Sequence, residues 1–237
     1  MKNLIFIVGL ALTGVLATAS SAAADTECNT TLTGVTVRSL TVPPGGNCVL
    51  DHAKVKGDVR VGRDAYFQAT HSKVTDDVKG RYAQTIFVED SSTVAGDIIA
   101  YRTAQVFLFD SRVGEDIDVN RTTDKVNVCG MTVHDDIEVE NSSRDILVGD
   151  PLAAGCDGNL VLRGEIEVDN NFTDVELVVR GNSILRGDLE VRNNDGPSDK
   201  FVEGNDGGDT LECSGNDQPF SASGNVDFDR TKGNQCG

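Results

Sequence analysis

The sequence predicts an all-β fold, a right-handed parallel β-helix of about nine coils with disulfide-capped ends. Three observations predict it. A seven-residue pattern recurs every 19–20 residues, short alternating apolar runs lie between its copies, and no segment of useful length after residue 24 has a helical period. One coil of a parallel β-helix takes roughly 20 residues, so each copy corresponds to one coil. An antiparallel sandwich or barrel is the alternative, but it does not explain the constant step.

The repeated pattern is an aliphatic residue, a variable residue, Gly or an acid, an acid, and then an aliphatic strand. It begins at Val55, Val74, Val94, Val113 and Val133, and returns after an insertion near 149–160 at Leu162 and Leu185. Further alternating runs at 86–88, 106–108, 126–128 and 146–148 supply a second strand in each coil. We expect inward Val, Ile and Leu to form continuous columns, which provide a core although only 5% of residues are aromatic.

Residues 1–24 are typical of a signal peptide. Lys2 precedes an apolar run over 4–19, and three alanines lead to a cleavage site between Ala24 and Asp25. The run is shorter than the ~20 residues that a membrane-spanning helix needs. We therefore expect a secreted protein, extracellular or periplasmic, without a transmembrane segment. The rest divides into an N-terminal cap and first coils (25–54), regular coils (55–212) and a C-terminal disulfide cap (213–237).

All six cysteines follow the cleavage site, which in an exported chain predicts disulfides. Pairing of sequence neighbours is the simplest arrangement: Cys28 with Cys48, Cys129 with Cys156, and Cys213 with Cys236. The outer two would cap the open ends of the β-helix, where unpaired strand edges invite aggregation. The middle one would anchor the insertion. We interpret all three as stabilising.

The chain is acidic, with a formal net charge of −17. Loss of Lys2 with the signal peptide, and of no acid, makes it −18. Such a charge argues against nucleic acid as a partner, because Lys and Arg must neutralise phosphates.

The opening TVPPGGNCVLDHAKVKGDV, the V-x-G-D-V coils and the closing CSGN…GN…QC resemble a group of secreted bacterial right-handed β-helix proteins that are functionally uncharacterised. The resemblance covers the whole mature chain. More remotely, the V-x-G-D-I rungs are similar to those of bactofilins, polymer-forming cytoskeletal β-helices. Bactofilins lack a signal peptide and these cysteines, so the resemblance implies the fold and a scaffold-like character but no cytoplasmic role. It supplies no catalytic residues.

One acid in each coil falls at the same place in the repeat, so the acids should stack as a column: Asp58, Asp77, Asp97, Asp116, Asp136, Glu165 and Asp188. Two interpretations remain open. The favoured one is that each carboxylate accepts a backbone N–H at a coil corner. The other is a weak calcium site, with Asp77, Asp97, Asp116, Asp136 and Asp209 as ligands. Asp209 belongs to GNDGGDTLE (204–212), which fits a calcium-binding nonapeptide except for its second residue. We expect no other cofactor.

Two histidines, His52 and His71, each lie three residues before a repeat and should therefore stack on neighbouring coils. Together with Asp51 they could hold a transition metal. The favoured interpretation is a chance surface neighbourhood.

Outward positions suggest two surfaces. The first strand presents Arg60 and Lys79, then Ile99, and then four acids, Asp118, Glu138, Glu167 and Glu190. This stripe could bind a charged polymer or direct end-to-end self-association, or it could simply be solvated. Phe87, Phe107 and Leu147 point outward if Ile86 points inward, and Phe87 and Phe107 would then form a contact patch for a polysaccharide or another protein. The favoured interpretation is that these side chains belong to the core or are covered by a loop.

We expect no enzymatic activity. The Asp-Asp pairs at 76–77 and 135–136 are explained by the corner column, and no Ser-His-Asp or Cys-His arrangement is visible. The sequence thus predicts an exported structural or surface-interaction protein with a scaffold, matrix or adhesion role. A carbohydrate-binding or polysaccharide-degrading β-helix is the alternative.

Overall fold

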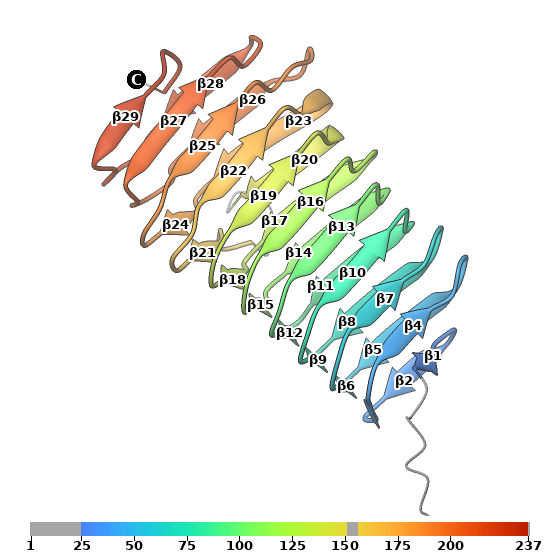
Figure 1. The fold of residues 1–237 in the computed structure, drawn as a ribbon. Coiled ribbons are helices and arrows are strands. Elements are labelled where there is room, and N and C mark those ends of the chain that lie inside the picture. The colour runs from blue at the N-terminus through green and yellow to red at the C-terminus, as the bar shows by residue number, and fades with distance from the viewer. Residues whose placement is uncertain (1–24, 151–155, 237) are drawn as a thin grey trace, which may run out of the picture.

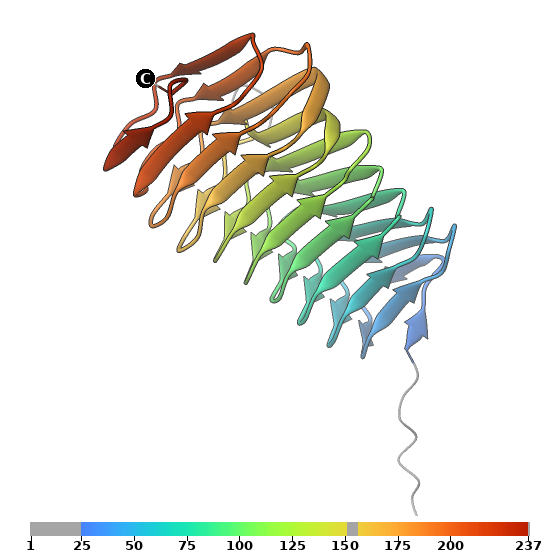
Figure 2. The same cartoon turned by 45° about the horizontal axis from the view of Figure 1, so that its top comes forward.

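The computed structural model describes residues 25–150 and 156–236, and the predicted signal peptide lies outside them. Within these residues all regular structure is β, arranged as a parallel β-solenoid, as the sequence predicts (Figures 1 and 2). No helix in the described ranges is long and apolar enough to cross a bilayer. The coils up to β24 each contribute one strand to sheet A, one to sheet B and a two-residue strand to sheet C, and the later coils contribute strands to sheets A and B.

Sheet A has eleven strands: β1 (Thr26–Glu27), β4 (Leu40–Val42), β7 (Val59–Val61), β10 (Val78–Arg81), β13 (Ile98–Tyr101), β16 (Ile117–Asn120), β19 (Ile137–Glu140), β22 (Ile166–Asp169), β25 (Leu189–Arg192), β27 (Thr210–Ser214) and β29 (Arg230–Lys232). Sheet B has ten: β2 (Thr31–Thr33), β5 (Asn47–Asp51), β8 (Tyr66–Thr70), β11 (Thr85–Glu89), β14 (Gln105–Phe109), β17 (Lys125–Cys129), β20 (Ser143–Gly149), β23 (Phe172–Arg180), β26 (Lys200–Glu203) and β28 (Phe220–Ser223). Sheet C has eight: β3 (Thr36–Val37), β6 (Lys54–Val55), β9 (Lys73–Val74), β12 (Thr93–Val94), β15 (Arg112–Val113), β18 (Thr132–Val133), β21 (Leu160–Val161) and β24 (Ser183–Ile184). The stack is about ten turns, slightly longer than predicted, because β1 and β2 already belong to it.

The parallel register places equivalent residues of successive coils directly above one another. In sheet A, Val78 pairs with Ile98, Ile98 with Ile117 and Ile117 with Ile137. These side chains are fully buried, as are the inward residues of sheet B such as Ile86 and Val106. The core is therefore a set of aliphatic columns, which confirms the predicted source of stability.

The repeat is displaced by one residue in two late coils. Val133 pairs with Val161, and Val161 with Ile184, so these buried residues occupy the sheet C position. The predicted first residues, Leu162 and Leu185, lie one position later, and Leu185 is 59% exposed. The prediction was wrong there because the corner between sheets C and A holds one more residue in these two coils. Each of these corners begins with two adjacent aliphatic residues, so the apolar pattern did not show which of the two starts the repeat.

Two corners of the coil contain buried amide ladders that the sequence analysis missed. One runs through Asn159, Asn182, Asn205 and Asn225, the other through Asn171, Asn194, Asn216 and Gln235. In each coil the Asn side-chain oxygen accepts from the backbone N–H of the preceding coil, and its Nδ2 donates to a carbonyl such as that of Val148. The N-terminal coils use Ser72, Ser92 and Ser111 at the first of these corners. The ladders satisfy the buried backbone where the chain turns.

The structure contains the three predicted disulfides. Cys28 is bonded to Cys48, Cys129 to Cys156 and Cys213 to Cys236, with Cα–Cα distances of 5.4, 5.6 and 5.1 Å. The first joins the start of the solenoid to β5, and the third joins β27 to the end of the described chain. The middle one ties Cys129 at the end of β17 to the segment before β21.

Candidate functional site

The corner between sheets C and A contains the predicted column of acids. Asp97 N–H donates to Asp77 Oδ1 (2.9 Å), and Asp116 N–H donates to Asp97 Oδ1 (3.1 Å). The amides of Asp136 and Glu165 likewise donate to the carboxylates one coil earlier, those of Asp116 and Asp136, at 2.9 and 2.7 Å. One oxygen of each acid from Asp77 to Asp136 is therefore a backbone acceptor, as the favoured interpretation predicts, although the N–H belongs to the next coil.

Asp209 does not continue this column. Leu189 pairs with Leu211, so the residue opposite Asp188 is the buried Thr210. Asp209 lies one position earlier and is exposed, and its amide donates to the carbonyl of Gly187. In this coil Thr210 takes the position that an acid holds in the earlier coils, and this separates Asp209 from the other predicted calcium ligands.

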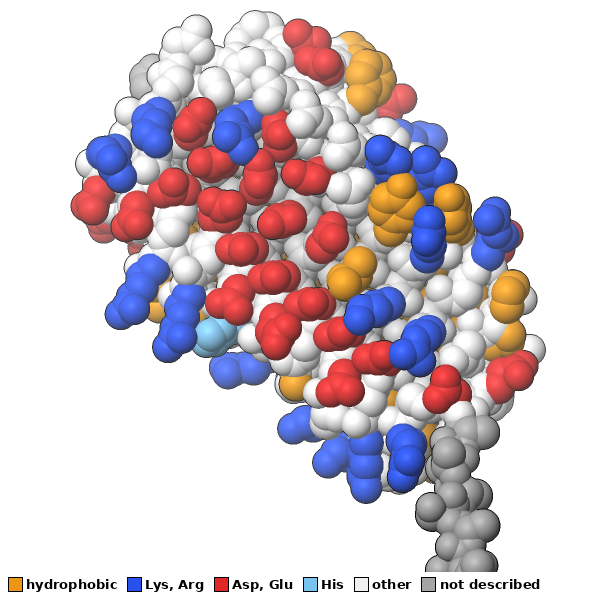
Figure 3. Space-filling view, in the orientation of Figure 1, with side chains coloured by type: hydrophobic (Ala, Val, Ile, Leu, Met, Phe, Trp, Pro, Cys, Tyr) orange, Lys and Arg blue, Asp and Glu red, His pale blue; other side chains and the backbone are white. Residues whose placement is uncertain are grey.

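The outward stripe on sheet A has the predicted register. Arg60, Lys79, Ile99, Asp118, Glu138, Glu167 and Glu190 are successive partners, and Glu212 extends the series. Figure 3 views this face: acidic side chains cover most of it, and Lys and Arg gather beside its N-terminal strands. In that half, Arg60 and Lys79 form ion pairs with Asp58 and Asp77 of the corner column. Burial acts to raise the pKa of Asp77, but hydrogen bonds from Lys79 and the Asp97 amide outweigh it and lower that pKa.

In the acidic half of sheet A, the charged neighbours of Glu138 and Glu165 are other carboxylates. Partial burial, reinforced by Asp118, raises the pKa of Glu138 to about 7. Burial, reinforced by Glu190, raises the pKa of Glu165 to about 7. In both cases the second contribution to the raised pKa is repulsion from a neighbouring carboxylate.

Carboxylate oxygens converge in two places that the sequence analysis did not single out. Among the described residues, the ligand oxygens of Glu140, Glu167 and Asp169 lie within 4.8 Å of one another, as do those of Glu165, Asp188 and Glu190. Arg192 already bridges Glu167 and Glu190. Convergence is thus greatest in the C-terminal coils, whereas the calcium prediction rested on Asp77, Asp97, Asp116 and Asp136. Which carboxylates converge depends on how neighbouring columns are aligned with each other, and a one-dimensional pattern does not contain that alignment.

A cluster of arginines and tyrosines lies at the opposite, N-terminal end of sheet A. We call it the Arg–Tyr patch; its members are Arg63, Arg81, Tyr82, Tyr101, Arg102 and Arg121. The Arg63 guanidinium lies 4.5 Å from the Tyr82 ring centre, and that of Arg81 lies 5.4 Å from the Tyr101 ring centre. Arg102 donates to the Tyr82 hydroxyl and Arg121 to that of Tyr101, both at 2.9 Å. Cation–π contacts and hydrogen bonds therefore hold both rings between guanidinium groups.

Two shallow grooves flank the patch. A groove of about 570 Å³ lies on sheet A between the two outward rows of side chains and is lined by Arg60, Lys79, Arg81, Ile99, Tyr101 and Asp118, with Val61 and Gly80. A second, of about 410 Å³, lies at the corner that follows sheet A and is lined by Arg63, Tyr82 and Arg102 among others. The sequence analysis found Arg60 and Lys79 but missed Tyr82 and Arg102, which occupy corner positions with positive φ rather than strand positions. It also missed Tyr101 at the end of β13.

Phe87 and Phe107 point outward from sheet B, as expected from the inward phase of Ile86. They are half-buried and pack against Phe109, with ring centres 5.5–6.3 Å apart. Asn127 and the nearly buried Leu147 continue the row. The three rings form a compact apolar patch on the side of the solenoid away from the stripe.

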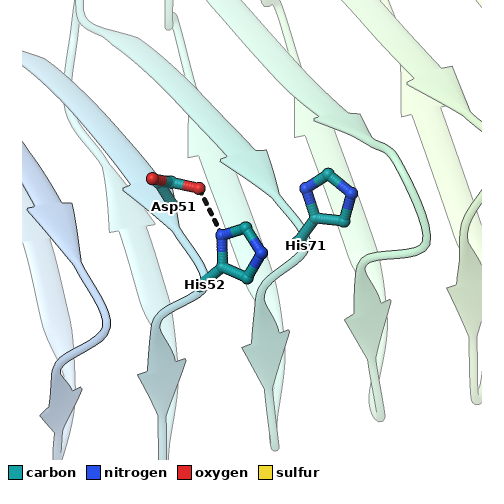
Figure 4. A group of neighbouring side chains, drawn as sticks. All are labelled: Asp51, His52 and His71. Carbon is teal, nitrogen blue, oxygen red and sulfur yellow. Dashed lines mark hydrogen bonds and ion pairs between the residues drawn. The ribbon is translucent and has the colours of Figure 1, made fainter.

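His52 and His71 stack as the repeat predicts (Figure 4). Their ring centres are 4.7 Å apart and nearly parallel, at 14°. Asp51 Oδ1 lies 2.6 Å from His52 Nδ1. Ligand atoms of all three residues lie within 4.8 Å of one another, so the structure brings the predicted group together. His134 is remote from this group and pairs with Asp135 at 3.0 Å.

Comparison of this chain with family models, with curated proteins and with solved structures gives no match.

Proposed function

We propose that the protein is an exported, non-enzymatic surface-interaction module, a rigid solenoid that binds an acidic polysaccharide through the Arg–Tyr patch. The observation that carries this proposal is the gathering of four arginines around two tyrosines on an otherwise acidic molecule. The sequence resemblance to secreted β-helix proteins and the scaffold-like character that it implies agree with this role.

The chemistry of the patch suits an anionic sugar polymer. Guanidinium groups bind carboxylate or sulfate in a bidentate manner, and the two tyrosines hold these guanidinium groups in place through cation–π contacts and hydrogen bonds. The groove beside the patch crosses strands β7 to β16, so it is long enough for several residues of a chain. Repulsion from the acidic strands β19 to β27 would confine a polyanion to the N-terminal half and orient the solenoid on a surface.

Three features support a role without catalysis. The Asp-Asp pairs belong to the corner, where Asp77 and Asp136 accept backbone hydrogen bonds. The pairs of acids with raised pKa repeat with the coils rather than forming one distinct site. The grooves at the patch are shallow and open. Turnover of a polysaccharide that is abolished by a single Asp substitution would contradict this part of the proposal.

The test of the binding site compares two double variants that remove equal charge. Arg81→Gln with Arg102→Asn removes half of the patch arginines; Asn tolerates the positive φ at position 102. The control, Lys54→Gln with Arg112→Gln, neutralises two outward cations of the sheet C row, which has no tyrosine. Binding of polygalacturonate and of neutral dextran is measured by calorimetry at fixed salt.

We expect the patch variant to bind polygalacturonate at least ~10-fold more weakly, because each lost charge-assisted hydrogen bond is worth roughly 1.5–3 kcal/mol. The control should change affinity by less than ~3-fold, since only screened long-range attraction is lost. Equal losses in both variants, or equal binding of neutral dextran, would contradict recognition at the patch.

A second candidate contact is the apolar patch of Phe87, Phe107 and Phe109. Its three adjoining half-buried rings favour a neutral glycan or a protein partner rather than a polyanion. Phe107→Ser should then abolish binding to a glycan array while leaving polygalacturonate binding intact. An array without hits for the intact protein would exclude the glycan.

Export is part of the proposal. Three disulfides fit an oxidising compartment, either extracellular or periplasmic. N-terminal sequencing of the protein from its native host should find Asp25 as the first residue.

A further inference from the structure

We propose that His52, His71 and Asp51 form a surface site for a divalent transition-metal ion such as Zn²⁺ or Cu²⁺. The inference is independent of the proposed function, because this group lies at the corner between sheets B and C and shares no residue with the Arg–Tyr patch. It rests on the backbone register, the positions of the rings and the position of the carboxylate.

The backbone fixes the two histidines relative to each other. Asp51 pairs with Thr70 in sheet B, so His52 and His71 occupy the same corner of adjacent coils. Both have nearly the same positive φ, 50° and 49°, and the His52 N–H donates to the carbonyl of Thr70. Their side chains therefore leave the surface in the same direction. Of the three histidines in the sequence, two share this corner.

The carboxylate organises one of the rings. Asp51 Oδ1 lies 2.6 Å from His52 Nδ1, so a neutral His52 donates its Nδ1–H to Asp51 and leaves Nε2 with a free lone pair. Carboxylates commonly hold metal-binding histidines in this way, which fixes the tautomer and strengthens the ligand. Figure 4 shows the second ring nitrogen of His52 on the side facing His71 in that view.

The spacing is close to what a metal ion requires. Two imidazole nitrogens that bind one ion at ~2.0–2.1 Å lie about 3–4 Å apart. The candidate ligand atoms lie within 4.8 Å of one another, so shifts of about 1 Å suffice. The His52 side chain is 64% exposed and can move without disturbing the core.

The donor set selects the class of metal. Imidazole nitrogen is a good ligand for Zn²⁺, Cu²⁺ and Ni²⁺, whereas Ca²⁺ and Mg²⁺ prefer oxygen. Binding at this group is therefore distinguishable from occupation of the acidic face of sheet A. The site provides two or three protein ligands and leaves the remaining coordination positions for water or for a group from another molecule.

The test uses the mature, disulfide-bonded chain (25–237) and titrates Zn²⁺ and Cu²⁺ by calorimetry in excess Mg²⁺, which occupies the carboxylates. The variants are His52→Asn and His71→Asn, because Asn accepts the positive φ. His134→Asn is a matched control: His134 also contacts a neighbouring Asp, at 3.0 Å, but no ring of the described residues stacks on it. Asp51→Asn examines the role of the carboxylate.

We expect one Zn²⁺ or Cu²⁺ ion to bind per chain, and the His134→Asn variant to bind it unchanged. His52→Asn and His71→Asn should each lower the affinity for the metal ion by at least ~10-fold. Asp51→Asn should lower it by about 10–100-fold, as replacement of outer-shell carboxylates does. Histidine NMR signals of His52 and His71 should shift together at one equivalent of Zn²⁺. Equal affinity in all variants, or an equal loss in His134→Asn, would overturn the proposal.

Discussion

The replacement Asn182→Ala tests how the buried amide ladders hold the coils together. The Asn182 Oδ1 accepts from the backbone N–H and the Nδ2 of Asn159, at 3.2 and 2.9 Å. Its Nδ2 donates to the Val148 carbonyl (2.9 Å) and to Asn205 Oδ1 (3.0 Å). Alanine removes all four bonds and leaves buried partners unsatisfied. At ~1 kcal/mol for each bond, with a further penalty for unsatisfied groups, we expect a loss of about 3–5 kcal/mol.

That loss is a large share of the ~5–15 kcal/mol that stabilises a typical protein. The assay is urea unfolding followed by far-UV circular dichroism, with hydrogen exchange to locate the destabilised coils. Asn120→Ala is the control, because Asn120 is half-buried on sheet A and its side chain donates one bond, to Glu140 at 2.9 Å. It should cost less than ~1 kcal/mol. A loss below ~1 kcal/mol in Asn182→Ala, without faster exchange in β21 and β24, would refute the role of the ladder.

Three further predictions concern stability. Since the folded pKa of Glu138 is about 7, above its unfolded value of ~4.5, the folded state binds the extra proton between these limits, and stability falls as pH rises through this window. Glu138→Gln should therefore raise the urea midpoint at pH ~8 and change it little at pH ~4; a decrease at pH ~8 would contradict the repulsion. Calcium should raise the melting temperature relative to chelator, with a smaller rise in Glu165→Gln, and equal melting temperatures would dismiss calcium binding. Cys213→Ser with Cys236→Ser opens a loop with a sequence separation of 23 and should cost about 3 kcal/mol, with faster hydrogen exchange confined to β27–β29; uniform exchange changes would contradict a local cap.

Much of the fold could be predicted because the repeat imposes it. A constant step places Val78, Ile98 and Ile117 in one column, and a parallel stack is the arrangement that buries such a column at every coil. The neighbouring-cysteine pairing follows from the same geometry, since cysteines about one coil apart come close together. Predictions failed at Leu162 and Leu185, where the corner of a coil gained a residue, because the apolar pattern does not reveal how many residues a corner holds. Asp209 lies outside the column of acids because Thr210 takes that position.

The candidate sites could be predicted less well, because they depend on relations between columns. The stacking of His52 on His71 required only the period, and it was predicted. The Arg–Tyr patch required knowing that Tyr82 and Arg102 share a corner and that Arg81 pairs with Tyr101 in sheet A. The asparagine ladders were missed because asparagine is common in exposed turns, and only the corner geometry turns these side chains inward.

The most direct test of the central claim is the footprint of an acidic polysaccharide on the intact solenoid. Hydrogen exchange is measured with and without saturating polygalacturonate. We predict slower exchange in segments 79–84 and 99–104, which contain Arg81, Tyr82, Tyr101 and Arg102, and no change in sheet C or in the acidic strands β19 to β25. Protection centred elsewhere, or none at saturating polymer, would contradict the Arg–Tyr patch as the binding surface.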